Sequence, residues 1–159
     1  MSTYQNGKLN KEEAVDITAA FTDSIFLENV YAAIGKTAPE PIYASDVAGI
    51  TSLDVDNESL WVKNLECFDG GKCTKDIDCC DGRTCRYGIE CLNGIEHFKA
   101  LTSLDCRWNA LVELPKLPPS LESLDCSSNF IKTLPKLPDG LIFLDCGYNE
   151  ITKLPELPS

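Results

Sequence analysis

The sequence predicts an α/β solenoid with a helical N-terminal cap, interrupted by a small disulfide-rich insertion. Three observations support this fold class. The C-terminal part holds three gap-free repeats with a period of 20 residues, a helical pattern precedes them, and six of the nine cysteines lie in one polar stretch between the two. Self-similarity at a fixed period is typical of solenoids, and dense cysteines are typical of disulfide mini-scaffolds.

The repeats begin at Leu101, Leu121 and Leu141 and share the pattern L-x-x-L-D-C-x-x-N-x-(L/I)-x-x-L-P-x-L-P. The LxxLDC part predicts a short strand, and the Asn after it predicts a turn. The Leu-Pro-x-Leu-Pro part predicts an extended return, because its prolines resist helix. A single coil cannot bury its leucines, so the coils must stack.

Two further positions recur in every repeat. One holds Asn109, Asn129 and Asn149, and the other holds Cys106, Cys126 and Cys146. A side-chain amide has donors and an acceptor, so it can satisfy backbone groups of its own coil and the next one. We interpret the cysteines as buried free thiols that act as small hydrophobes. A metal ladder would need a further ligand, and the single histidine, His97, lies outside the repeats.

Residues 1–49 are predicted to form the helical N-terminal cap. Asn10 and Glu13 form an N-x-x-E signature, so a helix is expected to start near Lys11. A second helix should stop at Gly35, and a third short turn should start at Ser45-Asp46. The apolar face of the second helix comprises Phe26, Leu27, Val30, Tyr31 and Ile34.

Residues 50–60 are predicted to hold the first strand, and Leu53 and Leu60 correspond there to Leu104 and Leu111 of the repeats. The separation along the chain from Leu53 to Leu104, and likewise from Leu60 to Leu111, is much longer than the roughly 20 to 29 residues of one coil. The stretch 61–91 is therefore predicted to be an insertion after the first strand, and residues 92–159 to be the repeats.

The insertion has the cysteine spacing C-x5-C-x5-CC-x4-C-x5-C, formed by Cys67, Cys73, Cys79, Cys80, Cys85 and Cys91. This density indicates disulfides rather than a hydrophobic core. Six cysteines allow fifteen pairings. A zinc site is the weaker interpretation, because the stretch lacks a nearby histidine and paired C-x-x-C spacing.

The repeats resemble bacterial leucine-rich repeats, and their LPxLPxSLxxLDCSxN form is similar to that of type III secreted effectors. The stretch FLENVYAAIGKTAPEPIYASDVAGITSLDV, from Phe26 to Val55, resembles the helical cap and first strand of internalin-like surface proteins. These resemblances imply a right-handed horseshoe with a concave parallel sheet that binds proteins.

The cysteine order of the insertion resembles inhibitor cystine knots (knottins). That resemblance implies the pairs Cys67–Cys80, Cys73–Cys85 and Cys79–Cys91, with the three repeat cysteines free. Disulfides persist outside the cytosol, so we expect an extracellular or cell-surface protein whose leader is absent from this chain; a bacterial effector is the alternative. A horseshoe with such an insertion is unusual in nature, so a deliberate graft is a second interpretation of its origin.

The net charge is −11 and the chain has no Lys/Arg-rich run, which argues against nucleic acid and anionic membranes as partners. No apolar run reaches the roughly 18 to 20 residues of a membrane span. We find no catalytic constellation, no phosphate-binding glycine pattern and no metal-ligand spacing, so we expect no enzyme and no cofactor. The chain stops in phase with the repeat, so we expect truncation after Ser159 or an end covered by a neighbour.

Two surfaces are candidates for protein binding. In the first hypothesis a knottin-like ligand or inhibitor is presented on the solenoid and binds a receptor, channel or protease. Its exposed residues would be Phe68, Lys72, Lys75, Ile77, Arg83, Arg86, Tyr87 and Ile89. The alternative is a bacterial surface or effector domain that recognises a host or substrate protein through its concave face. That face would present Asp105, Arg107, Trp108, Asp125, Phe143, Asp145 and Tyr148.

Overall fold

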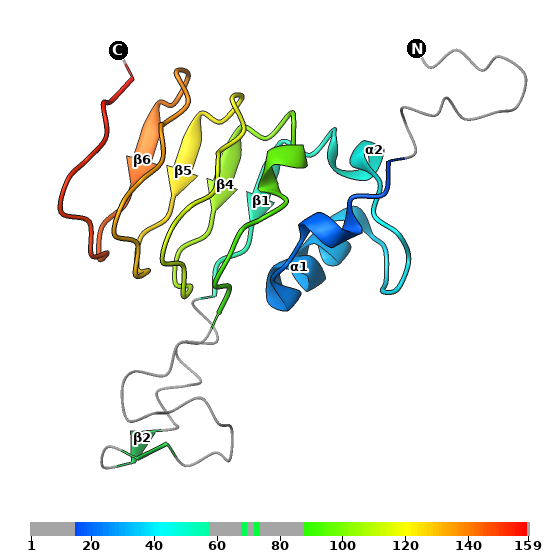
Figure 1. Cartoon of the computed structure of the whole chain (residues 1–159), viewed down its shortest axis with the longest axis horizontal. Coiled ribbons are helices and arrows are strands. Elements are labelled where there is room, and N and C mark those ends of the chain that lie inside the picture. The colour runs from blue at the N-terminus through cyan, green and yellow to red at the C-terminus, as the bar shows by residue number, and fades with distance from the viewer. Residues whose placement is uncertain (1–14, 58–67, 70–71, 74–87, 159) are drawn as a thin grey trace, which may run out of the picture.

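A solenoid of four stacked coils follows a helical cap (Figure 1). The computed structural model describes residues 15–57, 68–69, 72–73 and 88–158. Each coil contributes one short strand to a parallel sheet of order β1-β4-β5-β6. The strands are β1 (Ser52–Asp54), β4 (Ser103–Asp105), β5 (Ser123–Asp125) and β6 (Phe143–Asp145).

The strands pair in strict register, which places equivalent residues of all four coils in rows. Leu53, Leu104, Leu124 and Leu144 form the central row. Because side chains alternate along a strand, this row points into the solenoid and its two neighbouring rows point out. β1 pairs directly with β4, so the strands on either side of the long stretch between them belong to consecutive coils.

The core lies between the sheet and the extended returns. Strand leucines, the Leu or Ile after each Asn, and the leucines of the Leu-Pro-x-Leu-Pro returns fill it. Leu104, Leu111, Leu124 and Ile131 are at most 1% exposed. Burying each such side chain contributes about 1.5 to 3 kcal/mol, which explains why the coils hold together without long strands.

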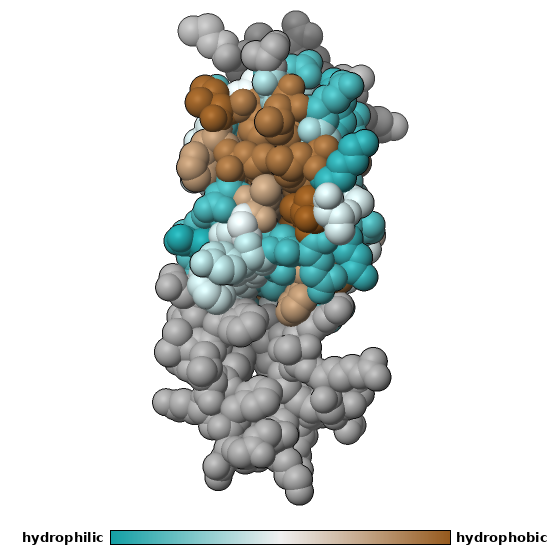
Figure 2. Space-filling view, turned by 90° about the vertical axis from the view of Figure 1, so that its left-hand side faces the viewer, coloured by the Kyte–Doolittle hydropathy of each residue, from teal (hydrophilic) through white to brown (hydrophobic). Residues whose placement is uncertain are grey.

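The last coil leaves its apolar side open. Figure 2 shows a hydrophobic band across this end of the molecule. Leu154 is 48% exposed, whereas Leu134, its equivalent one coil earlier, is 8% exposed. The difference arises because the next coil covers Leu134, while no described residue covers Leu154. Within the described part of the chain, no helix is long and apolar enough to cross a membrane.

The cap confirms the predicted second helix. Helix α1 (Ser24–Ile34) ends at Gly35 in the left-handed conformation, which glycine adopts without a Cβ clash. Its predicted apolar face packs on the core. The predicted third turn is α2 (Ala44–Val47), and a short 3-10 turn, η1 (Thr18–Ala20), precedes α1. The helix predicted to start near Lys11 begins outside the described residues, and it does not continue into them, because residues 15–17 are not helical and Asp16 forms a bridge with Tyr43.

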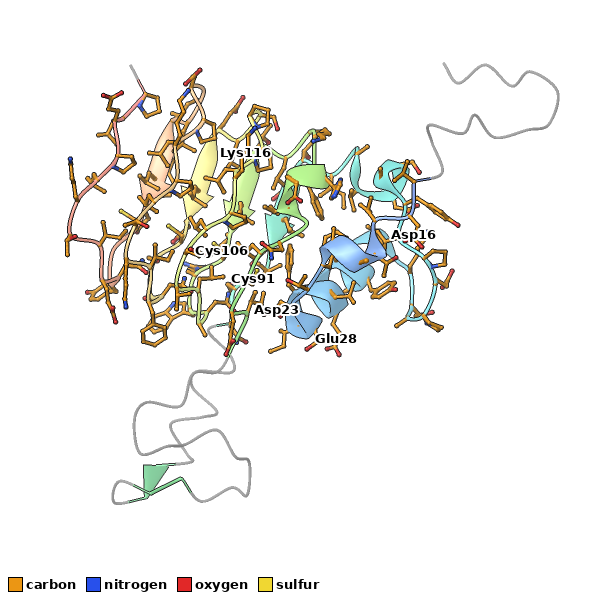
Figure 3. All side chains as sticks on the ribbon, viewed as in Figure 1. Asp16, Asp23, Glu28, Cys91, Cys106 and Lys116 are labelled. Carbon is orange, nitrogen blue, oxygen red and sulfur yellow. The ribbon has the colours of Figure 1, made fainter. Side chains whose placement is uncertain are left out.

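Asp23 joins the cap to the first coil. One carboxylate oxygen caps α1 by accepting from the backbone N–H groups of Ile25 and Phe26, both at 2.9 Å. The other accepts from Glu90 N at 2.7 Å and Cys91 N at 3.3 Å, and Figure 3 shows Asp23 beside Cys91. One side chain therefore starts the helix and also fixes it against the solenoid.

The return of the first coil corrects one predicted correspondence. Ile89 N donates to Asn109 Oδ1 at 2.9 Å, just as Leu111 N donates to Asn129 Oδ1 at 3.0 Å. Ile89, which is 1% exposed, is therefore the counterpart of Leu111, and the predicted counterpart, Leu60, lies outside the described residues. The physical reason is that the asparagine ladder sets the register.

Gly88 to Cys91 were predicted to end the insertion, but the structure places them in the first coil, followed by a 3-10 turn, η2 (Ile95–His97). Ile89 is accordingly a core residue and not an exposed binding residue of the insertion. Inside the insertion, the structure describes only the backbone of a short antiparallel pair, β2 (Phe68–Asp69) and β3 (Lys72–Cys73).

Candidate functional site

The exposed sheet face is formed by the two outward rows of the strands and by the residues just after them. One row holds Ser52, Ser103, Ser123 and Phe143, and the other holds Asp54, Asp105, Asp125 and Asp145. We call these residues, with Asp56, Arg107 and Ser127, the sheet face. Four of the seven predicted concave-face residues, Asp105, Asp125, Asp145 and Phe143, lie in these rows, and Arg107 follows directly.

The aspartate row has a structural role that the sequence analysis missed. In each coil, one Asp oxygen accepts from the backbone N–H two residues later. The distances are 3.1 Å for Asp54, 3.2 Å for Asp105, 3.0 Å for Asp125 and 2.9 Å for Asp145. Such turns are what short acidic side chains form at chain reversals. The recurring Asp at the end of each predicted strand was the available signal.

The remaining charge of the aspartate row is unevenly compensated. Arg107 pairs with Asp105 at 3.2 Å and with Asp56 at 3.6 Å. Burial raises the pKa of Asp105, while the hydrogen bond from Arg107 N and the guanidinium charge lower it in part. Asp54, Asp125 and Asp145 form no ion pair with any described residue. The aspartate row is therefore without a compensating cation from the described part of the chain in the first, third and fourth coils.

The carboxylate oxygens of Asp54, Asp56 and Asp105 lie within 4.8 Å of one another. Oxygen ligands at this spacing suit a hard cation. The Arg107 guanidinium, however, already supplies positive charge to two of the three carboxylates. The cluster is therefore explained as an ion-pair network of the sheet face.

Trp108 and Tyr148 lie beside the sheet face and not on it. They follow the strands and, together with Ser128, have positive φ angles of 56°, 52° and 55° respectively. The three residues occupy one position of the turn, directly before the ladder asparagines. Trp108 and Tyr148 line a hollow of about 270 Å³ with Ser128, Asn129 and Phe130. The sequence analysis missed Phe130, whose position holds Ala110 in the preceding coil.

The ladder asparagines have the predicted structural role. Asn129 Oδ1 accepts from Leu111 N at 3.0 Å, and its Nδ2 donates to Cys106 O at 3.0 Å and Cys126 O at 3.1 Å. Asn109 and Asn149 make the equivalent bonds one coil before and after. The amide groups of these asparagines are engaged in hydrogen bonds to the backbone, so they are not available to a ligand.

The repeat cysteines are free thiols in the structure, as predicted. Cys106 and Cys126 are fully buried, and Cys106 is labelled inside the solenoid in Figure 3. Burial raises the pKa of Cys126 to about 12, and the neighbouring thiol of Cys146 and the carboxylates of Asp125 and Asp145 add to the effect. Burial also raises the pKa values of Cys106 and Cys146. These thiols stay protonated and act as packing groups.

Cys91 differs from its predicted role as half of a Cys79–Cys91 bridge, because its thiol is free in the structure. It belongs to the first coil, where Asp23 holds its backbone. Its Sγ accepts from Asn93 N at 3.3 Å and lies 3.8 Å from Thr22 Oγ of the cap. Its predicted partner lies outside the described residues, as do Cys67, Cys80 and Cys85.

The rest of the cystine knot, with the bridges Cys67–Cys80 and Cys73–Cys85, therefore stays a prediction. Of its proposed binding residues, Lys75, Ile77, Arg83, Arg86 and Tyr87 also lie outside the described part of the chain. Phe68 and Lys72 are described only as backbone, in β2 and β3.

Stacked parallel strands, an asparagine ladder and leucine-filled coils define a leucine-rich-repeat solenoid. Its fold is internalin-like. The solved structure of the functional domain of InlJ from Listeria monocytogenes, which includes a cysteine ladder, matches with a TM-score of 0.61 and 25% identity. The match covers 93% of this chain and 27% of that chain, so this chain spans about a quarter of that protein's length. Neither a protein-family model nor a curated protein matches the chain.

The cysteine ladder of the InlJ domain has a counterpart in this chain. Cys106, Cys126 and Cys146 occupy one position of three consecutive coils. In the first coil Val55 takes this position, because Val55 N donates to Asp105 O as Cys106 N donates to Asp125 O one coil later. The ladder thus begins only after the insertion.

Proposed function

We propose that this chain is a non-enzymatic recognition module of a bacterial surface or secreted protein, and that it binds another protein through its sheet face. The observation that carries the proposal is the contrast between the two sides of the strands. The inward strand leucine is the same in all four coils, whereas two outward positions differ between coils: Phe143 stands where the other strands have serine, and the residue after the cysteine ladder changes from coil to coil. The position after the cysteine ladder, for example, holds Asp56, Arg107, Ser127 and Gly147.

The chemistry of the sheet face supports a protein partner. It is a broad surface of hydroxyl, carboxylate and guanidinium groups with the half-exposed aromatic ring of Phe143 at one end. Aromatic and arginine side chains are enriched among the residues that dominate binding energy at protein interfaces. The likeness to the internalin-like fold supports the same class of function.

Photo-crosslinking tests this proposal. Benzoylphenylalanine placed at Ser123, in the centre of the sheet face, should crosslink a specific protein from host-cell surface extracts. The matched control position is Lys136 on the return segment, whose side chain is 85% exposed. The captured protein, once purified, should bind the unmodified chain saturably by calorimetry.

Substitution then decides whether the sheet face is the site. Ser123→Arg should weaken binding of the captured protein at least about tenfold, because a bulky charge would disrupt the centre of the contact. Lys136→Ala should leave binding unchanged. Equal capture at both positions, or binding that tolerates Ser123→Arg, would rule out the sheet face.

A further inference from the structure

A second surface lies along the turns that follow the strands, at the lower edge of the sheet in Figure 1. Its centre is the hollow of about 270 Å³ between Trp108 and Tyr148, with Phe130 from the intervening coil. Three aromatic side chains from three consecutive coils therefore contribute to one concavity. Tyr148 is 90% exposed, so its ring is not needed for the core.

The solenoid does not require aromatic residues at these positions. The position of Trp108 and Tyr148 holds Ser128 in the coil between them, and the position of Phe130 holds Ala110 and Glu150 in its neighbours. Moreover, Trp108 and Tyr148 have φ angles of 56° and 52°, a conformation that favours glycine and asparagine over bulky residues. Tyr148 keeps this strained conformation at an exposed position, which points to function rather than folding.

The charges around the hollow indicate what it accepts. Asp125 and Asp145 stand in the strands that lead into its turns, and neither forms an ion pair with a described residue. The nearby Lys132 is paired with Glu150 at 3.9 Å. Arg107, next to Trp108 in the chain, is likewise paired, with Asp56 and Asp105. The two remaining carboxylates favour a cation, and aromatic faces attract cations directly.

We propose that this hollow receives an arginine side chain of the protein partner. A planar guanidinium stacks on aromatic rings and is weakly hydrated, which suits an apolar hollow better than the compact, strongly hydrated lysine ammonium. The inference rests on the proposed protein-binding function and specifies the chemistry of the partner. It adds an arginine pocket at the turn edge to the broad contact on the sheet face.

A pair of small probes tests the pocket without the partner. N-acetyl-arginine methylamide carries the guanidinium, and N-acetyl-citrulline methylamide is its neutral near-isostere. The chain has two tryptophans, Trp61 and Trp108, so Trp61→Phe leaves one indole N–H signal to follow by NMR. The arginine probe should shift this signal saturably, with a Kd at least about fivefold lower than that of the citrulline probe.

Two variants complete the design. Tyr148→Asn removes one ring and suits the left-handed backbone, so it should fold as well as the parent and bind the arginine probe at least about threefold more weakly. Ile142→Ala, in the same coil but outside the hollow, should bind it like the parent. Circular dichroism and thermal unfolding of both variants establish that they are folded.

Equal affinity for the two probes would overturn the assignment of a cation, and an apolar side chain would then fit the hollow better. An effect of the arginine probe that Tyr148→Asn leaves unchanged would also overturn it, as general attraction to an acidic surface. Either failure leaves crosslinking at Ser123 untouched, so the arginine pocket and the protein-binding function are judged separately.

Discussion

At the scale of single residues, the turns after the strands depend on side-chain hydrogen bonds. Asn129 links three backbone segments that would otherwise be buried without partners, because its amide reaches Leu111 N, Cys106 O and Cys126 O. The aspartate at each strand end closes the turn from the outside. Both devices use short polar side chains, since these can reach the backbone of their own turn.

Replacing Asn129 by Ala should destabilise the solenoid by roughly 1 to 3 kcal/mol, because it strands buried donors and acceptors. Urea unfolding followed by circular dichroism measures the loss. Asn149→Ala is the matched control in the last coil. Asn149 is only partly buried, so water can replace part of its bonding and the loss should be smaller. Equal losses of stability in Asn129→Ala and Asn149→Ala would show that the burial of the asparagine does not determine how much its removal destabilises the solenoid.

At the scale of the coil, three-residue strands are stable only through packing between coils. The cysteine ladder contributes small apolar groups to that packing, and burial keeps the thiols protonated. The folded Cys126 thiol has a pKa of about 12 against an ordinary value of 9.0. Between these values the unfolded chain binds fewer protons than the folded chain. This part of the stability is therefore full below about pH 9 and is lost as the pH rises.

Cys126→Val tests this linkage, and Val55 shows that the ladder position accepts valine. In reducing buffer at pH 7 the free energy of unfolding of the variant should lie within about 1.5 kcal/mol of that of the parent. Between pH 9 and 11 the free energy of unfolding of the parent should fall more steeply with pH than that of Cys126→Val. The difference in slope should be at most about 1.4 kcal/mol per pH unit. Cys146→Val, at the partly exposed end of the ladder, should change the slope less. Parallel pH profiles of the parent and Cys126→Val would contradict a buried neutral thiol.

For the molecule as a whole, the cap, the coils and the inserted stretch are joined at well-defined points. The chain leaves the first coil after Asn57 and is back in it at Gly88, where hydrogen bonds to the second coil resume. Asp23 holds the cap to the returning segment. Because a solenoid's stability is close to a sum of coil and neighbour terms, we expect the contacts between the described coils to survive removal of the stretch between these points.

In a variant that lacks residues 58–87 and has one residue inserted before Gly88, the repeats should still unfold cooperatively. Their free energy of unfolding should lie within about 1 kcal/mol of that of the parent. Thermal and urea unfolding measure this. As a control, Asp23→Ala in the full chain should destabilise by about 1 kcal/mol or more, since it removes the helix cap and its contact with the first coil. If the deletion variant fails to fold, the inserted stretch is an integral part of the first coil.

Thiol counting tests the cystine knot. Alkylation after denaturation without reductant should label the three repeat cysteines if the knot forms with Cys91 as its sixth member. Full reduction should expose all nine cysteines. Labelling of Cys91 together with Cys106, Cys126 and Cys146 would match the four thiols that are free among the described residues and would exclude the Cys79–Cys91 bridge. Peptide mapping by mass spectrometry identifies the labelled residues.

Local patterns along the chain were enough to predict the coils, the inward leucines, cysteines and asparagines, and helix α1 with its end at Gly35. These features repeat at fixed spacing or follow local capping rules. Three others emerged only from the folded chain: Ile89 completes the first coil, Asp23 joins cap and solenoid, and Trp108, Phe130 and Tyr148 meet in one hollow. Each depends on contacts between residues distant in the chain, and the stacking of coils, which sets the register, creates those contacts.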